Sequence, residues 1–241
     1  MGFVDLHSHI LFGIDDGAQK AADSTAMLDA LARFGVTDSC VTPHQKANQY
    51  LPSADQIQVS LAAVHALRQP HHPTLRLGAE NMWDDVFFGR LHDGTIPSYA
   101  DSSAFLFELP LSHGLPVGLE QALFKLRMAK RLPVLAHPER YQALWADTEL
   151  AQRLASQCAF VLDLPALAGF HGKHEAKAAR RMVETGLFHA VATDAHSAED
   201  VSRAAEGFSW LRKHTRSGVA ETAFRDAPLA ILAGHLPDLL R

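Results

Sequence analysis

Gly2-Phe3-Val4-Asp5-Leu6 and Thr37-Asp38-Ser39-Cys40-Val41-Thr42 are two short β-prone segments, and between them lies a stretch with helical periodicity. The apolar residues of this stretch recur at helical spacing from Ala22 to Phe34, and Gly35 follows as a helix stop. Strand, helix and strand in this order predict a βαβ unit. The two strands of such a unit are parallel, because the helix returns the chain to the same end of the sheet.

The same alternation continues along the chain. Helical patterns recur, and one of them begins at a capping box formed by Ser53 and Gln56. The alternation predicts an α/β fold with a mostly parallel sheet, closed or nearly closed into a TIM-like barrel, and an open doubly wound sheet is the alternative. The further β-prone runs are Leu75–Ala79, Ala104–Leu109, Leu132–Ala136, Ala159–Leu164 and Phe188–Thr193.

Length and composition restrict the organisation and the partners of the protein. The 241 residues are 47% hydrophobic and contain no repeat or linker, which predicts a single domain over residues 1–241. A net charge of −5 gives no general attraction for nucleic acid, and no apolar run is long enough for membrane insertion. Cys40 and Cys158 are too few for a disulfide framework and indicate reduced thiols in the cytoplasm.

Two histidines at the end of the first predicted strand are candidate metal ligands. Side chains alternate along a strand, so His7 and His9 point to the same side, where both imidazoles can hold one ion. A solvated pair of histidines is the alternative. The following Asp15-Asp16-Gly17 has the composition of a turn, in which Asp15 is expected to form an Asx-turn before the next helix.

Most of the later predicted strands also end at a residue that can bind a metal. A single polar residue at the end of a strand usually caps the backbone or forms hydrogen bonds in the core. In a barrel, however, the residues at the carboxyl ends of all the strands line one rim. Carboxylates gathered on one rim repel one another unless cations lie between them. The pattern therefore predicts two or three ions of zinc, manganese, iron or cobalt, held without thiolates. The residues are His44, Glu80, Glu108, His137, Asp194 and His196.

These motifs together resemble the polymerase-and-histidinol-phosphatase (PHP) superfamily, and within it the bacterial CpsB/YwqE-type tyrosine-protein phosphatases. The resemblance extends from Met1 to about Glu199. The His-x-His start is shared by many metallohydrolases, whereas its combination with the other motifs is more specific. The motifs are His7-Ser8-His9 with Asp15-Asp16-Gly17, Gly78-Ala79-Glu80, Ala136-His137-Pro138-Glu139-Arg140-Tyr141 and Thr193-Asp194-Ala195-His196.

The resemblance implies a distorted (β/α)7 barrel that binds three divalent ions, with manganese favoured and iron, zinc, cobalt or magnesium as alternatives. It also implies that Arg140 holds the phosphoryl group of the substrate and that Glu80 or Asp194 bridges ions. For a poorer leaving group than a phenolate, we expect His196 or Asp194 to assist its departure. The implied metal ligands are His7, His9, Asp16, His44, Glu80, Glu108, His137, Asp194 and His196.

The chain departs from the family pattern at three places. The family has a second arginine seven positions after its equivalent of Asp194, where this chain has Val201, and the nearest candidate is Arg203. Arg203 is therefore the candidate for the second catalytic arginine, although a helix turns about 100° per residue and a shift of two residues can direct its guanidinium away from the site. The basic residues after the second strand are reduced to Lys46, and Asp163 replaces the usual asparagine. These departures concern the substrate more than the ions.

The predicted activity is metal-dependent hydrolysis of phosphotyrosine in a protein. The implied partner is a phosphotyrosine-bearing protein such as a bacterial tyrosine kinase, and the implied role is exopolysaccharide or capsule regulation. Two alternatives remain open: a small-molecule PHP phosphatase such as histidinol phosphatase, and a metal-binding module without turnover that acts through partners. The oligomeric state is left open.

Two other phosphate-handling motifs are not present. Cysteine-based phosphatases have Cys, five further residues and then Arg, whereas Lys46 and Leu164 stand at that spacing from the two cysteines. The segment Gly169–Lys173 is rich in glycine but lacks the spacing of a P-loop, and is interpreted as a loop that enters a helix.

Overall fold

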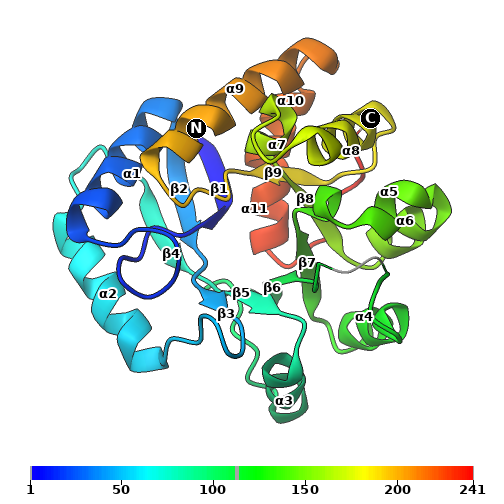
Figure 1. Ribbon diagram of the computed structural model, residues 1–241, viewed down its shortest axis with the longest axis horizontal. Coiled ribbons are helices and arrows are strands. Elements are labelled where there is room, and N and C mark those ends of the chain that lie inside the picture. Colours follow the sequence, from blue (N-terminus) through cyan, green and yellow to red (C-terminus); the bar gives the residue numbers. More distant parts are fainter. Residues whose placement is uncertain (1, 112–113, 241) are drawn as a thin grey trace.

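Parallel strands form the centre of the molecule, and helices surround them (Figure 1). The computed structural model describes residues 2–111 and 114–240, so Met1, Ser112, His113 and Arg241 lie outside the described residues. One sheet has the order β1-β2-β4 and the other the order β3-β5-β6-β7-β8-β9, with every pair of neighbours parallel. The α/β fold with parallel strands is therefore confirmed. The strands are β1 (Phe3–Ser8), β2 (Val36–Val41), β3 (His44–Gln45), β4 (Thr74–Leu77), β5 (Glu80–Met82), β6 (Ala104–Glu108), β7 (Leu132–Ala136), β8 (Ala159–Asp163) and β9 (Ala190–Ala192).

Two short strands that the sequence patterns did not predict continue the chain from one sheet into the other. β3 begins after a two-residue break that contains Pro43, and β5 begins after a break that contains Gly78. A Cβ atom at Gly78 would lie 2.9 Å from the ring of Tyr99, so this close approach requires glycine. The strand predicted at Leu75–Ala79 is therefore divided, and Glu80 begins β5 in the second sheet.

At the other edge, β1 lies beside the segment that follows β9. Ser8 and Ala195 form an isolated parallel bridge, and the N–H of His9 donates to the carbonyl of Ala195 at 2.9 Å. The backbone N–H and the hydroxyl of Thr193 donate to the carboxylate of Asp5 at 2.9 and 2.6 Å. The carboxyl ends of the first and last strands are thus held together.

The predicted helix signals are confirmed where the structure tests them. The Ser53 hydroxyl accepts the N–H of Gln56 at 3.2 Å, and the Ser53 N–H donates to the Gln56 side chain at 2.8 Å. Gly35 ends the first helix with a φ of 94°. None of the helices among the described residues is long and apolar enough to cross a membrane. The helical elements are α1 (Ala21–Phe34), α2 (Ala54–Leu67), α3 (Asp85–Asp93), α4 (Leu119–Met128), η1 (Pro138–Arg140), α5 (Gln142–Ala146), α6 (Thr148–Ala155), α7 (Leu164–Ala168), α8 (Lys173–Glu184), α9 (Ala198–His214), α10 (Val219–Glu221), η2 (Thr222–Asp226) and α11 (Ala227–Leu232).

Apolar side chains form an inner and an outer cluster. The outer cluster joins the strands to the surrounding helices, and the inner cluster joins side chains of several strands to α11. Burial of one such side chain contributes about 1.5–3 kcal/mol to folding. Cys40 and Cys158 are both free and buried in these clusters, in agreement with the prediction of reduced thiols. Members of the inner cluster include Leu6, Leu106, Val134, Val161 and Ile231.

A buried histidine just before β9 makes the stability of the fold depend on pH. His189 is 1% exposed, and its Nδ1 accepts the N–H of Phe160 at 2.9 Å. Burial lowers the pKa of His189 to about 4, whereas an unfolded histidine titrates near about 6.5. Between these pH values only the unfolded chain binds the proton. The His189 contribution to the free energy of unfolding should therefore fall, by up to about 3 kcal/mol, as the pH decreases from about 6.5 to about 4.

Urea unfolding at about pH 7 and about pH 4.5, followed by circular dichroism, measures this effect. The matched variant is His189→Asn, whose amide oxygen can still accept the N–H of Phe160 but cannot titrate. The variant should lose less stability than the parent chain between the two pH values. An equal loss in both proteins would contradict the role of His189.

Candidate metal centre

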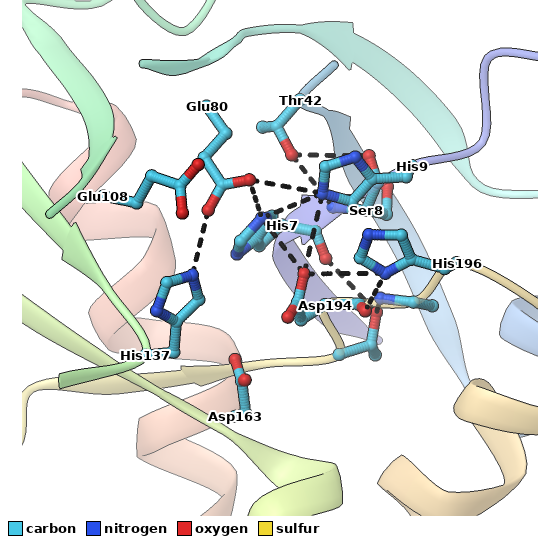
Figure 2. Close-up of polar contacts among 12 residues, drawn as sticks. His7, Ser8, His9, Thr42, Glu80, Glu108, His137, Asp163, Asp194 and His196 are labelled. Atoms are coloured by element: carbon cyan, nitrogen blue, oxygen red, sulfur yellow. Dashed lines mark hydrogen bonds and ion pairs between the residues drawn. The ribbon is translucent and has the colours of Figure 1, made fainter. Parts of the chain in front are cut away.

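The predicted metal ligands lie together at the carboxyl ends of the strands (Figure 2). Parallel strands deliver them to one edge, because all carboxyl ends of a parallel sheet point the same way. Each predicted ligand has at least one other in close contact. They come from β1 and the loop after it (His7, His9 and Asp16), from β3 (His44), β5 (Glu80) and β6 (Glu108), and from the segments after β7 (His137) and β9 (Asp194 and His196).

Glu80 lies in the middle of the group and contacts four imidazoles. Its Oε1 lies 3.0 Å from Nε2 of His137. Its Oε2 lies 3.3 Å from Nε2 of His7, 3.5 Å from Nε2 of His9 and 2.8 Å from Nδ1 of His44. Figure 2 shows the carboxylate between His137 and the pair of His7 and His9. A buried carboxylate with imidazoles around both oxygens is suited to bridge two cations.

Two aspartates extend the group. Asp194 Oδ1 lies 3.2 Å from Nε2 of His7 and 3.6 Å from Nε2 of His9. Asp16 Oδ1 lies 3.3 Å from Nε2 of His44 and 3.5 Å from Nε2 of His196. Three subsets each have the dimensions of one ion site, because their ligand atoms lie within 4.8 Å of one another. These subsets are His7, His9 and Asp194; His9, Asp16, His44 and His196; and His44, Glu80 and Glu108.

Several atoms of the group are not satisfied by other protein atoms. The Nε2 atoms of His7 and His9 lie 3.1 Å apart, and only one of them can be the donor toward the other. Nδ1 of His44, Oε2 of Glu80 and Oε1 of Glu108 are buried without a well-aligned hydrogen bond to any described residue. Two ligand atoms at right angles around an ion, each about 2.1 Å from it, lie about 3 Å apart. The donor set and its spacing therefore fit divalent cations.

The electrostatics of the group favour positive charge. Burial alone would lower the pKa of His7, but Asp194 and Glu80 outweigh burial and raise this pKa to about 9. For His196, burial is likewise outweighed by Asp16 and Asp194, which raise the pKa to about 10. Burial would raise the pKa of Glu80, yet the surrounding imidazoles hold it well below the usual range. Divalent ions would displace the histidine protons on binding.

Asp15 supports the centre in addition to forming the predicted turn. Its Oδ1 accepts the N–H of Gly17 at 3.0 Å, as expected for an Asx-turn. Its Oδ2 lies 3.0 Å from Nδ1 of His9 and accepts the N–H of His44 at 3.2 Å. A carboxylate at Nδ1 fixes the ring and leaves Nε2 for an ion. A Cβ atom at Gly17 would lie 2.2 Å from the carbonyl oxygen of His9, so glycine lets the turn close on β1.

Tyr141 supports His137 in a similar way. The Tyr141 hydroxyl lies 3.2 Å from Nδ1 of His137 and accepts the N–H of Leu109 at 2.9 Å. His137 itself has a φ of 37°, and Asp194 has a φ of 45°. Left-handed backbone at a residue other than glycine costs on the order of 1–3 kcal/mol and is concentrated at functional sites. Two of the predicted ligands therefore occupy strained positions that the surrounding structure maintains.

Arg140 lies beside the centre, at the end of η1. Its Nη2 donates to Asp163 at 2.6 Å and to Asp194 at 2.5 Å. Burial would lower the pKa of Arg140, but Asp163 and Asp194 keep it well above its usual value. Asp163 Oδ1 has no hydrogen-bond partner among the described residues. Two carboxylates, those of Asp163 and of the predicted ligand Asp194, thus hold the guanidinium beside the centre.

Arg203 is not brought to the centre. Its guanidinium pairs with Glu199 at 3.4 Å and with Glu206 at 3.3 Å on its own helix, α9, and lies over the ring of Phe170. The physical reason is the angular shift of two residues along the helix, which directs the side chain elsewhere.

The cysteines offer no alternative nucleophile. Cys40 and Cys158 are fully buried, and burial raises the pKa of both thiols far above the usual value. A thiolate is therefore disfavoured at either position.

A cavity of about 690 Å³ adjoins Arg140. Trp145 of α5, His171 of the loop before α8, and His174 of α8 contribute to its wall. A volume of this size is within the range of ligand sites in proteins. The cavity gives a substrate room to place a charged group beside Arg140.

Comparisons with known proteins show the family to which the chain belongs. The family model for capsular polysaccharide synthesis proteins, CpsB/CapC, matches residues 3–233. The tyrosine-protein phosphatase YwqE of Bacillus subtilis is 32% identical over 206 residues, which cover 80% of this chain and 77% of YwqE. The tyrosine-protein phosphatase CpsB of Streptococcus pneumoniae is 26% identical over 242 residues, which cover 97% of this chain and 99% of CpsB.

A solved structure is similar to this chain over the whole fold. It comes from crystal structures of YwqE from Bacillus subtilis and CpsB from Streptococcus pneumoniae, described as unique metal-dependent tyrosine phosphatases. The TM-score is 0.86 at 26% sequence identity, and the match covers 99% of both chains. A parallel α/β fold with buried imidazoles and carboxylates at its strand ends defines a candidate metalloprotein. The chain belongs to the CpsB/CapC family, which confirms the resemblance seen in the sequence.

Proposed function

We propose that the chain is a metal-dependent protein-tyrosine phosphatase. The observation that carries the proposal is the position of Arg140, which lines a cavity of about 690 Å³ and lies beside the group of imidazoles and carboxylates. Arginine binds phosphoryl oxygens through a planar fork of N–H donors, so this arrangement suits a phosphate ester. The names of the relatives, which are tyrosine-protein phosphatases, support the same substrate class.

In this proposal the predicted ligands hold three divalent ions, with manganese favoured over iron, zinc, cobalt and magnesium. The three subsets of ligand atoms described above, which share His9 and His44, support a centre with more than one ion. Mixed imidazole and carboxylate donors without thiolates suit these metals better than a soft copper site. Divalent ions supply Lewis acids that lower the pKa of water and offset the charge on phosphoryl oxygens.

The residues of the chain orient the ester and complete the reaction. Arg140 binds the phosphoryl group, while Asp163 and Asp194 fix its guanidinium. His196 Nδ1 lies 2.9 Å from the carbonyl of Asp194, which leaves Nε2 for an ion or for a proton. We assign to His196 or Asp194 the assistance of a leaving group poorer than a phenolate. A phenol has a pKa of about 10, so its departure as phenolate needs little protonation.

The biological setting is part of the proposal. Residues 1–241 would act as one metallophosphoesterase domain, with the two parallel sheets as parts of one distorted TIM-like barrel of the (β/α)7 type. The bridge between Ser8 and Ala195 supports this arrangement. The substrate would be a phosphotyrosine-bearing protein, such as a bacterial tyrosine kinase, in capsule or exopolysaccharide regulation. The buried free thiols of Cys40 and Cys158 support a cytoplasmic location.

Phosphate release from three esters tests the proposal. Purified protein with Mn²⁺ should hydrolyse a phosphotyrosyl peptide and an aryl phosphate, and a chelator should abolish both activities. Histidinol phosphate serves as the third substrate. Turnover confined to histidinol phosphate would favour a small-molecule phosphatase. Bound metal without turnover of any ester would favour a non-catalytic metal-binding module.

A further inference from the structure

A second cavity, of about 540 Å³, runs along helix α8 and is lined mainly by basic side chains. Lys173, Lys177, Arg180 and Arg181 line it, and Glu184 is the one acidic side chain in its wall. The whole chain carries a net charge of −5, so this concentration of positive charge is local. We call this cavity the α8 groove.

Three of these cations form no ion pair with any described residue. Arg180 is occupied, because its guanidinium donates twice to the carbonyl of Leu167 and lies over the ring of Trp210. No carboxylate among the described residues pairs with Lys173, Lys177 or Arg181. These three side chains are exposed and available to a partner.

The position of Lys173 is unfavourable for the helix itself. It occupies the first turn of α8, where the helix dipole disfavours positive charge by about 0.3–1 kcal/mol, and its neighbour on the N-terminal side is Gly172. Lys177 and Arg181 follow at intervals of four residues, so the three cations form one stripe. The stability of α8 therefore does not explain why a lysine occupies position 173.

The α8 groove adjoins the cavity that contains Arg140. Helix α8 packs against η1, which carries Arg140, and Figure 1 shows α8 next to α5 and α7. His174, in the first turn of α8, lines the cavity at Arg140, while Lys173 lines the groove. The loop before α8, which the sequence patterns left without a role, lies between the two cavities: His171 faces the first, and Gly169 faces the second.

We propose that the α8 groove binds an acidic segment of the phosphotyrosyl protein whose phosphate is bound at Arg140, an inference that rests on the proposed function. The helical rise places Lys173 and Arg181 about 12 Å apart, which equals about four residues of an extended chain. A peptide with acidic residues at alternate positions on one side of its phosphotyrosine matches this stripe. Charge complementarity of this kind raises specificity and the association rate.

Two phosphotyrosyl peptides of equal length test the inference, one with three such acidic residues and one with glutamines in their place. With Mn²⁺ and low salt, kcat/KM should be about tenfold higher for the acidic peptide, because each exposed ion pair makes a small contribution and three act together. The preference should decrease toward unity at about 1 M salt, where charges are screened. Equal rates for both peptides at low salt would overturn the inference.

The groove variant Lys173→Glu, Lys177→Glu, Arg181→Glu should lose this preference or reverse it. The matched control variant Arg33→Glu, Lys130→Glu, Lys213→Glu makes the same change in net charge at helix and loop positions outside the α8 groove and should keep it. Circular dichroism checks that both variants fold. Loss of the preference in both variants would show a general charge effect and contradict the groove.

Direct binding separates failure of the inference from failure of the proposed function. Fluorescent peptides with a nonhydrolysable phosphonate in place of the phosphate are titrated with the manganese-loaded protein. Tighter binding of the acidic peptide without turnover of any ester would support the groove and overturn the phosphatase. Equal binding of the two peptides, with or without turnover, would overturn the inference. Vesicles of phosphatidylglycerol are titrated in parallel, and binding that depends on the groove residues but occurs only with these vesicles would also overturn it.

Discussion

Glu80→Gln should remove most of the metal and lower kcat/KM for a phosphotyrosyl peptide by at least about a thousandfold. The substitution keeps the size of the side chain but removes a charge at the point where His7, His9, His44 and His137 meet. It also introduces an N–H₂ donor next to the position of a cation. A thousandfold loss corresponds to about 4 kcal/mol of lost stabilisation of the transition state. Metal analysis and steady-state kinetics of the purified variant measure both effects.

The matched control is Glu120→Gln on α4. Glu120 forms an exposed ion pair with Arg153 at 3.3 Å, and such pairs contribute about 0–1 kcal/mol. This variant should keep the metal content and the rate of the parent protein. If Glu80→Gln behaved in the same way, Glu80 would not be a ligand, and the assignment of the centre would be wrong.

Arg140→Ala should keep the metal and lower kcat by about 100- to 1,000-fold, the range seen when one donor to a developing charge is removed. Arg140 is placed to bind the phosphoryl group but supplies no ligand atom, since its guanidinium bears only donors. Arg140→Lys should recover only part of the rate, because an ammonium lacks the planar fork. Kinetics with saturating Mn²⁺ and metal analysis check this prediction.

Arg153→Ala is the control for this substitution, because Arg153 forms an exposed ion pair with Glu120, its one ion-pair partner among the described residues, and should not affect the rate. Arg140 also neutralises Asp163 and Asp194. A parallel loss of metal and rate in Arg140→Ala would therefore indicate that the arginine acts by holding these carboxylates in place. Full activity of Arg140→Ala would exclude a role in binding the phosphate.

Most of the strands and the grouping of the candidate ligands could be predicted from the sequence, because both depend on local patterns. An apolar run followed by His137 or Glu108 predicts a strand and the residue at its carboxyl end, and parallel strands then bring these residues to one edge. The short strands β3 and β5 have two and three residues. Such strands carry too little periodicity to be recognised, and their pairing is decided by neighbours elsewhere in the chain.

The supporting contacts could not be predicted, because they join residues whose relation depends on the completed fold. The local sequence predicts only a turn for Asp15, whereas its second oxygen contacts His44, which is 29 positions away in the sequence. Asp163 reaches Arg140 across 23 positions. Arg203 shows the converse: its place in the sequence is close to a family position, but the structure pairs its side chain with Glu199 on the same helix.

In the proposed centre, residues from position 7 to position 196 enclose several divalent ions. Anomalous X-ray diffraction at the manganese absorption edge, from crystals of the protein grown with Mn²⁺, tests it most directly. We predict three peaks among the imidazoles and carboxylates around Glu80, each about 2.0–2.5 Å from its ligand atoms. An empty centre in metal-loaded crystals, or manganese bound only elsewhere on the molecule, would contradict the claim.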